Sequence, residues 1–299
     1  MAKINIQFTL FSAFYSPLIA TMSAGFLKEE GLDFEWSVSP PGKSAIEAAV
    51  NGSAHVIQTA PSQAFNALNK GEPSPVLHFG KVNEMDGFFI SARQPDADFS
   101  WKKLEGAEVV MFGGGQPNAM FRYACYKAGI DYDKIIPITP GGPDAIDQAF
   151  RDGQGQYVQQ QGPYPQQLEV EGMAHVVAQV GSLIGPCAFS SLAASREWLQ
   201  TDEARAFTRA YAKARMYLNE TAADEIAANE IAYFTGTDEK ALRNCIATYQ
   251  QLGCWTPEVA ITPEAFEVIL DVYEYCGGIN QRYAYDQVCC APPQFKASS

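Results

Sequence analysis

The sequence predicts an α/β protein made of two lobes, each built around a mostly parallel sheet. Strand-like and helix-like segments alternate along residues 4–92 and again along residues 108–151, which is typical of parallel strands joined by helices that cover both faces of a sheet. A polar stretch, residues 93–98, separates the two runs, and long amphipathic helices follow residue 201. These observations favour two α/β units joined by crossings, with helices packed against them.

The first lobe opens with a strand of alternating residues, a turn and a helix. Its helices are expected to end at Gly31, Gly52 and Gly71, because glycine is the usual residue at the left-handed position that follows a helix. In order, the predicted elements are strand 4–10, helix 18–30, strand 32–38, a break at Pro40-Pro41-Gly42, helix 44–51, strand 54–58, helix 63–70 and strands 76–79 and 87–92.

The second lobe repeats the plan and is entered through the polar stretch 93–98. The return crossing is expected near residues 185–190, so the first lobe comprises residues 1–92 and 191–299 and the second comprises 93–190. The remaining predicted elements are strands 108–112 and 134–138, helices 119–128 and 144–151, and the packing helices 201–219, 222–234, 239–251 and 263–276.

Composition and charge exclude several classes of protein. The 299 residues are 47% hydrophobic and 18% charged, which suits a globular chain with a large core. Lys plus Arg number 21 against 34 Asp plus Glu, and the net charge of −13 opposes binding to a nucleic-acid backbone. The most apolar stretch, residues 8–27, is interrupted by serine and threonine, so no membrane-spanning helix is expected.

Two turns that follow predicted strands of the first lobe carry candidate ligand-binding residues, because open α/β sheets bind ligands at the carboxyl ends of their strands. The first turn holds Phe11, Phe14 and Tyr15, which offer a stacking wall or, equally, belong to the core. The second turn holds Thr59 and Ala60. A hydroxyl in this turn either contacts a ligand or caps the helix that follows.

A glycine-rich turn opens the first helix of the second lobe and is the clearest anion seat in the sequence. Gly113, Gly114, Gly115 and Gln116 stand between a strand and a helix, where free backbone N–H groups and the helix dipole favour an anion. The turn is neither a P-loop nor a dinucleotide fingerprint. The alternative interpretation is a flexible strand-to-helix turn that binds no ligand.

Gln160 and Cys187 complete the candidate ligand-binding residues. Gln160 lies in a run of glutamines, residues 159–161, whose amides suit a neutral, polar, planar ligand, although a polar edge strand has the same pattern. Cys187 lies in the expected return crossing and is predicted to face the cleft. As a nucleophile it would need a base and a cationic environment that its sequence neighbours do not supply, so a buried thiol is favoured.

Metal-binding and catalytic motifs are not found. The three histidines are far apart, none forms HxxH or HExxH, and no CxxC is present. We therefore expect no metal, no cofactor and no catalytic residue. The seven cysteines leave at least one thiol unpaired in a monomer and favour a reducing compartment.

Several segments taken together resemble a known family. "SAFYSPLIATMSAGFLKEEGLDFEW", "AIEAAVNGSAHVIQTAPS", "KKLEGAEVVMFGGG" and "CAFSSLAASREWLQTDEARAFTRAYAKA" are similar, in that order, to the substrate-binding proteins of nitrate, sulfonate, taurine and thiamine-precursor ABC transporters and to the related pyrimidine-precursor synthases of thiamine biosynthesis. The resemblance implies a type II periplasmic-binding-protein fold, with a small molecule held between the lobes by the turns 11–16, 59–62 and 113–118.

The sequence departs from the enzymes of that group. The synthases carry a Lys and, four residues on, a His where this chain reads Thr59 to Gln63, and their cysteine-rich stretch survives only as Cys187. A related desulfinase has a cysteine in the first turn, where this chain has Ser12 and Ser16. The resemblance therefore favours binding over catalysis.

The expected function is capture of a small polar, aromatic or weakly anionic solute for ABC-type uptake, with an ABC permease as the partner that the resemblance implies. The alternative is a cytoplasmic enzyme on the same scaffold that acts on a pyrimidine-like or sulfur-containing aromatic substrate. The expected location of the protein is the periplasm if a leader was removed, and the cytoplasm otherwise. Hinge motion near residues 92–100 and 185–192 is expected to close the lobes on the ligand.

Overall fold

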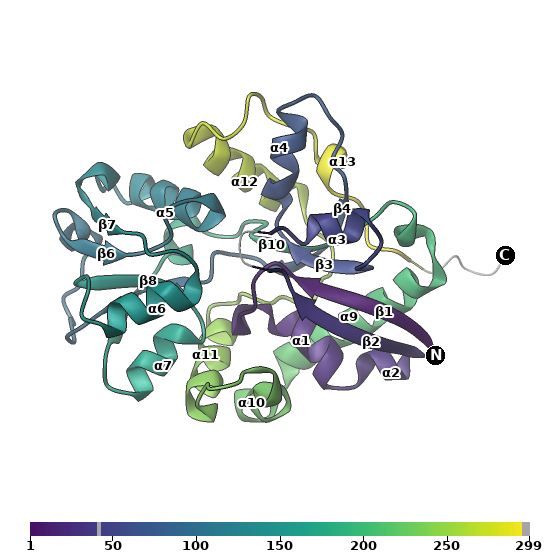
Figure 1. The fold of residues 1–299 in the computed structure, drawn as a ribbon, viewed down its shortest axis with the longest axis horizontal. Coiled ribbons are helices and arrows are strands. Elements are labelled where there is room, and N and C mark those ends of the chain that lie inside the picture. The colour runs from purple at the N-terminus through teal and green to yellow at the C-terminus, as the bar shows by residue number, and fades with distance from the viewer. Residues whose placement is uncertain (41–42, 295–299) are drawn as a thin grey trace.

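The computed structural model describes residues 1–40 and 43–294 and contains two five-stranded sheets within them. Pro41 and Gly42, part of the break predicted after the second strand, lie outside the described residues. The two sheets lie side by side, with helices packed around both (Figure 1).

The first sheet has the strand order β2-β1-β3-β10-β4. β1 runs parallel to β2 and β3, whereas β10 is antiparallel to both β3 and β4. The bounds are β1 Ala2–Phe8, β2 Leu32–Val38, β3 Val56–Thr59, β4 Leu77–Asn83 and β10 Ser190–Ala194. β1 ends earlier than predicted, so Thr9 and Leu10 belong to the turn that follows.

The second sheet has the order β7-β6-β8-β5-β9, with β6 parallel to β7 and β8 and with β5 antiparallel to β8 and β9. The bounds are β5 Phe88–Ala92, β6 Glu108–Val110, β7 Ile136–Ile138, β8 Tyr157–Gln161 and β9 His175–Gln179. The predicted sequence of strands and helices is thus arranged as two mostly parallel sheets.

The chain passes between the sheets at residues 84–87 and returns at residues 180–189. The first crossing lies before the stretch 93–98 where it was predicted, because β5 pairs with β8 and β9 and so belongs to the second sheet. Residues 88–92, which were predicted to belong to the first lobe, therefore belong to the second sheet. The return interval contains residues 185–189 of the predicted return crossing.

Helices cover the sheets. The predicted helix 18–30 is split by Gly25, whose φ of 83° is left-handed, into two shorter helices. The bounds are α1 Ser16–Ser23, α2 Phe26–Glu29, α3 Ile46–Val50, α4 Phe65–Leu68, α5 Gly115–Lys127, α6 Pro143–Arg151, α7 Tyr164–Val170, α8 Gly181–Ile184, α9 Asp202–Glu220, α10 Ala223–Glu230, α11 Glu239–Gln251, α12 Pro263–Tyr275 and α13 Tyr285–Val288, with 3-10 turns at Ala13–Tyr15, Pro61–Ala64, Trp101–Leu104, Tyr132–Lys134, Trp198–Gln200 and Ile231–Tyr233.

The C-terminal helices hold the two halves together. α9 packs on α1, whereas α11 packs on α7 and on the turn Ala13–Tyr15. The buried hydroxyl of Tyr249 in α11 donates to the carbonyl of Gly87 (2.8 Å) and accepts from the amide of Gly162 (2.9 Å). α11 thereby ties the first crossing to the end of β8, behind the space between the sheets.

Candidate functional site

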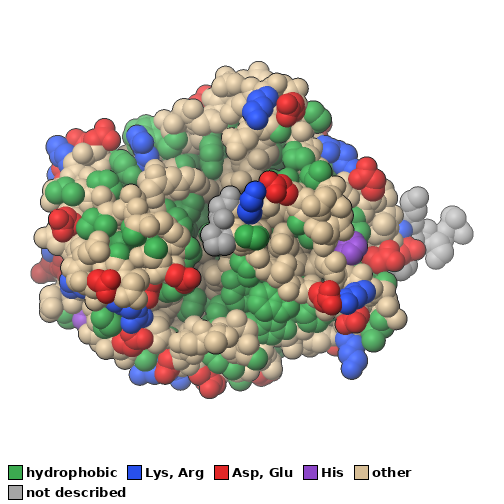
Figure 2. Space-filling view, in the orientation of Figure 1, with side chains coloured by type: hydrophobic (Ala, Val, Ile, Leu, Met, Phe, Trp, Pro, Cys, Tyr) green, Lys and Arg blue, Asp and Glu red, His purple; other side chains and the backbone are tan. Residues whose placement is uncertain are grey.

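A chamber of about 260 Å³ lies where the two halves meet, at the ends of their strands. Figure 2 shows the surface hollowed between these halves. Each half contributes side chains from its turns, the return crossing adds Phe189, and the first residue of β10 adds Ser190. The lining residues are Thr9, Leu10, Tyr15, Gln58, Thr59, Ala60, Gln63, Phe88, Phe112, Gly114, Gly115, Gln116, Pro117, Gln161, Phe189 and Ser190.

One part of the chamber wall is held by hydrogen bonds between neighbouring strands. Oε1 of Gln58 accepts from the backbone N–H of Thr9 (3.2 Å), and Nε2 of Gln58 donates to the Ser190 hydroxyl (2.7 Å). The Ser190 hydroxyl in turn donates to the backbone carbonyl of Thr59 (2.9 Å). These bonds fix the ends of β1, β3 and β10 relative to one another.

Gln116 links the two halves across the chamber. Its Oε1 accepts from the Ser62 hydroxyl of the first half (2.5 Å), and its Nε2 donates to the carbonyl of Phe189 in the return crossing (2.6 Å). Both polar atoms of this amide are therefore used within the protein. The Ser62–Gln116 bond holds the start of α5 against the turn Pro61–Ala64.

Other polar atoms of the wall have no partner. Nε2 of Gln161 and the hydroxyl of Thr59 are buried and make no hydrogen bond within the described residues. The Tyr15 hydroxyl lies beside Gln58, Gln161 and Ser190, and burial raises its pKa, so it is neutral. Because a buried polar atom without a partner is costly, Gln161 and Thr59 are the groups that a ligand would satisfy.

The chamber carries no charged side chain among its lining residues. Its apolar surface is aromatic: Phe88 meets Phe112 edge-on with 5.7 Å between ring centroids, and Phe189 lies 6.2 Å from Phe88. The start of α5 adds backbone amides, with no side chain capping the helix at Gly114. The wall therefore combines aromatic faces, amides and hydroxyls with one helix dipole.

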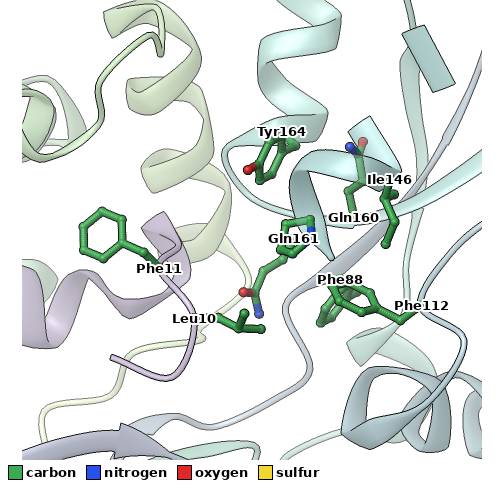
Figure 3. A pocket seen from close by; sticks show the side chains of 9 residues that line it. Leu10, Phe11, Phe88, Phe112, Ile146, Gln160, Gln161 and Tyr164 are labelled. Atoms are coloured by element: carbon green, nitrogen blue, oxygen red, sulfur yellow. The ribbon is translucent and has the colours of Figure 1, made fainter. Parts of the chain in front are cut away.

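Most of the predicted ligand-binding residues meet in or beside this chamber. Phe11 instead lines a wider hollow outside the chamber, and Gln160 lines a small recess beside it. Nε2 of Gln160 donates to Asp147 (3.0 Å), on the opposite face of β8 from Gln161. Figure 3 shows Gln161 beside Leu10 and Phe88, whereas Gln160 lies near Ile146. The predicted residues that line the chamber are Tyr15, Thr59, Ala60, Gly114, Gly115 and Gln116.

Phe14, Gly113 and Cys187 were predicted to contact the ligand but do not line the chamber. The Phe14 ring is fully buried, 4.7 Å from that of Tyr249, and a Cβ on Gly87 would lie 2.6 Å from it. A Cβ on Gly113 would lie 3.0 Å from Thr139. Cys187 is fully buried, and burial raises the pKa of its thiol well above the usual range. All three side chains or positions belong to the packing behind the wall.

Several residues that line the chamber were not among the predicted ligand-binding residues. Gln161 belongs to the predicted run of glutamines, residues 159–161. Successive side chains of β8 point to opposite faces, so Gln161 faces the chamber and Gln160 does not. Phe88 opposes Gln161 directly in the strand pairing and faces the same way. Four other lining residues could have been predicted from their position at the ends of strands. Thr9, Leu10, Gln58 and Phe112 lie at the same sheet edges as the turns that were predicted to bind the ligand.

Several buried titratable groups lie outside the chamber, and Asp86 and His78 are two of them. Asp86 in the first crossing accepts from the amide of Phe88 (2.7 Å), its Oδ2 has no partner, and burial raises its pKa to about 7. His78 on β4 is fully buried beside Ser191 (2.7 Å), and burial lowers its pKa to about 3. Within residues 1–40 and 43–294, no group of three or more His, Cys, Asp or Glu side chains is placed to hold a metal ion.

Comparison with known proteins assigns the family. Residues 9–232 match the NMT1-like family. The chain belongs to the NMT1-like family. Among curated proteins, this NMT1-like chain is 26% identical over 292 residues to "Putative binding protein YtlA" of Bacillus subtilis (strain 168), covering 96% of this chain and 87% of YtlA.

Solved structures share the fold of this NMT1-like protein. The ligand-binding component of an ABC-type import system from Staphylococcus aureus superposes with a TM-score of 0.78 at 15% identity, covering 100% of this chain and 99% of that one. The alkanesulfonate-binding protein SsuA of Xanthomonas axonopodis pv. citri gives 0.73 at 17%, covering 97% and 99%. The predicted periplasmic-binding-protein fold is confirmed. In the described part of the chain, no helix has the length and apolar character needed to cross a membrane.

Proposed function

We propose that this protein is the solute-binding component of an ABC import system and that it holds a small, uncharged, polar and aromatic molecule in the chamber. The uncharged lining of the chamber carries the proposal. A strong acid buried there would keep its charge with no cation beside it, which is costly, whereas a neutral ring would stack on Phe88, Phe112 or Phe189.

The unpartnered atoms of the wall define what the ligand must offer. Nε2 of Gln161 needs an acceptor, and the Thr59 hydroxyl can donate or accept. The backbone amides at the start of α5 add donors that also suit a weak anion such as an aromatic carboxylate. A planar ring that carries a carbonyl, amide or ring nitrogen meets these requirements.

The names of related proteins support the role in import. YtlA is named as a binding protein, and the Staphylococcus aureus and Xanthomonas proteins are named as ligand-binding or alkanesulfonate-binding proteins. A component of this kind works outside the cytoplasmic membrane and presents its closed, loaded form to a permease. We extend both the location and the permease partner to this chain as part of the proposal.

The enzymatic alternative finds less support in the chamber. The lining residues include no His, Cys, Asp, Glu or Lys side chain, and the thiol of Cys187 and the neutral imidazole of His78 are fully buried outside it. A nucleophile would have to be the hydroxyl of Thr9, Tyr15, Thr59 or Ser190, and the lining residues offer no carboxylate, imidazole or amine to activate it.

A thermal-shift panel tests the proposal. Pyrimidines and thiamine precursors, aromatic carboxylates, sulfonates, nitrate and bicarbonate are each titrated against the protein, and a ligand that binds only the folded state raises the unfolding midpoint. We expect saturable shifts with neutral aromatic compounds and smaller ones with nitrate and sulfonates. Preference for the strong anions would contradict the chemistry proposed, and consumption of the compound would favour the enzyme.

A further inference from the structure

Outside the chamber the space between the halves widens into a hollow of about 1050 Å³. The two spaces are continuous because Thr9, Leu10 and Phe112 line both. The chamber itself is large enough for about one substituted ring. A longer ligand that enters the chamber can therefore extend over Leu10 and Phe112 into the hollow.

Three aromatic side chains, Phe11, Tyr233 and Phe234, line one wall of the hollow. Trp36 packs on Phe11 and Tyr233 just outside the lining, and we call these four side chains the aromatic shelf. Phe11 stacks on Trp36 with centroids 5.0 Å apart and lies 5.0 Å from Phe234, and Trp36 lies 5.5 Å from Tyr233. Trp36 is 37% exposed and neighbouring Val38 is 40% exposed. Figure 2 shows hydrophobic side chains gathered beside the hollow on this side.

The charged groups of the hollow stand on the opposite wall and are mostly engaged with one another. Arg151 is paired with Asp147 (2.5 Å) and with Glu171. The Tyr164 hydroxyl donates to Asp144. Lys43 stands on the rim of the first half. The shelf is thus a partly exposed apolar surface that begins at the chamber mouth. The ion-paired groups lie across the hollow from it, and Lys43 is a charged side chain on its own side.

We propose that the ligand is longer than the chamber and that its distal part is an aryl or other apolar group that lies on the aromatic shelf. This inference rests on the proposed function, because the chamber must hold the polar head of the same molecule. An exposed apolar patch that continues a binding cavity gains free energy when it is covered. Stacked rings in the shelf favour a planar group, which can add to the stack.

Two neutral probes of different length test the proposal. Benzamide fits the chamber, and 4-benzyloxybenzamide adds a second ring at the end that points out of it. Affinities are measured by isothermal titration calorimetry for the natural chain and for Tyr233→Ala, which removes a partly exposed ring of the shelf that lines the hollow. Tyr126→Ala is the matched control, because Tyr126 is a 56% exposed aromatic residue stacked on Tyr275, away from the hollow.

We expect the longer probe to bind at least about tenfold more tightly than benzamide, since burial of a second ring contributes that much. This ratio should fall to about threefold or less in Tyr233→Ala and should stay unchanged in Tyr126→Ala. If benzamide binds without a gain from the second ring, or if the gain survives Tyr233→Ala, the shelf does not hold the ligand, and the chamber proposal is unaffected.

Two other outcomes would also contradict the shelf proposal. If neither probe binds, the chamber proposal fails together with the shelf. If the natural chain self-associates in analytical ultracentrifugation and Tyr233→Ala does not, the shelf is an interface with a second copy and the ligand proposal for it is wrong.

Discussion

Four glutamine side chains line the chamber, and three of them, Gln58, Gln116 and Gln161, distinguish two regions of its wall. In the fixed region, Gln58 and Gln116 use both ends of their amides within the protein. In the free region, Gln161 leaves Nε2 unpartnered, as Thr59 leaves its hydroxyl. This difference suggests two roles for glutamine in the chamber. Gln58 and Gln116 hold the wall in shape, whereas we propose that Gln161 forms a hydrogen bond to the ligand.

The largest effect on binding is expected for Gln161→Leu. Removing the unpartnered amide should weaken binding of the best neutral solute by about 10- to 100-fold, because a buried hydrogen bond to the ligand is lost. The free energy of unfolding should change little, since Nε2 of Gln161 has no well-formed hydrogen bond in the free protein and only lies beside the Tyr15 hydroxyl. Calorimetric titration and urea unfolding measure the two quantities.

Gln160→Leu is the matched control on the same strand. Nε2 of Gln160 bonds Asp147, so its loss should lower stability and leave affinity nearly unchanged. Equal affinities for the natural chain and Gln161→Leu would remove Gln161 from the free region.

Asp86→Asn tests whether a buried, unpartnered atom that does not line the chamber affects stability rather than ligand binding. Oδ2 of Asp86 is buried without a partner, but Asp86 does not line the chamber. Its pKa is about 7 in the folded protein and 3.8 is the reference value. The folded state therefore keeps the proton longer, and the contribution of Asp86 to stability declines as pH rises from about 4 to about 7.

The asparagine variant should lack this decline and should be more stable than the natural chain at pH 8. Urea unfolding between pH 4 and pH 8 measures the difference, which should vanish at pH 4. A stability gain independent of pH would contradict the assignment, and a change in ligand affinity would place Asp86 in the binding wall.

The link between Ser62 and Gln116 is expected to be weaker and to affect both stability and binding. Ser62→Ala or Gln116→Ala should lower stability by about 1 kcal/mol, and affinity should fall less than in Gln161→Leu. In a double-mutant cycle the two changes should be strongly non-additive, because they remove the same bond. Small-angle scattering should show a larger radius of gyration in both variants without ligand; additive effects would mean that the bond does not hold the halves together.

Thr59→Val should have the smallest effect. The variant keeps the shape of the side chain and removes a buried hydroxyl that has no partner in the protein. Affinity is expected to fall by about threefold, with stability unchanged or slightly raised. A loss of stability would show that this hydroxyl belongs to the fixed region.

Much of the site follows from the rule that parallel strands present their ends at one sheet edge. That rule located the turns with Tyr15, Thr59 and Gly114 before any coordinates. It could not choose between Gln160 and Gln161, because both faces of β8 are buried and hydropathy does not fix which glutamine faces the cavity. Nor could it show that Phe14 turns inward, since the packing of Tyr249, far along the chain, decides this.

The position of the first crossing was harder to predict for a related reason. Residues 88–92 read as one more strand of the first run, and only their pairing with β8 and β9 assigns them to the second sheet. Strand existence is a local property, whereas sheet membership depends on contacts with residues that come much later in the chain.

The insertion of β10 between β3 and β4 also sets the order in which the protein can be made. All strands of the second sheet lie within residues 88–179, so that sheet is complete once its own stretch has left the ribosome. The first sheet waits for Leu192 to meet Gln58. Until then the edges of β3 and β4 that β10 will cover are unpaired and can pair with other chains. The incomplete first lobe is therefore the folding intermediate in which a chaperone would be most needed to prevent aggregation.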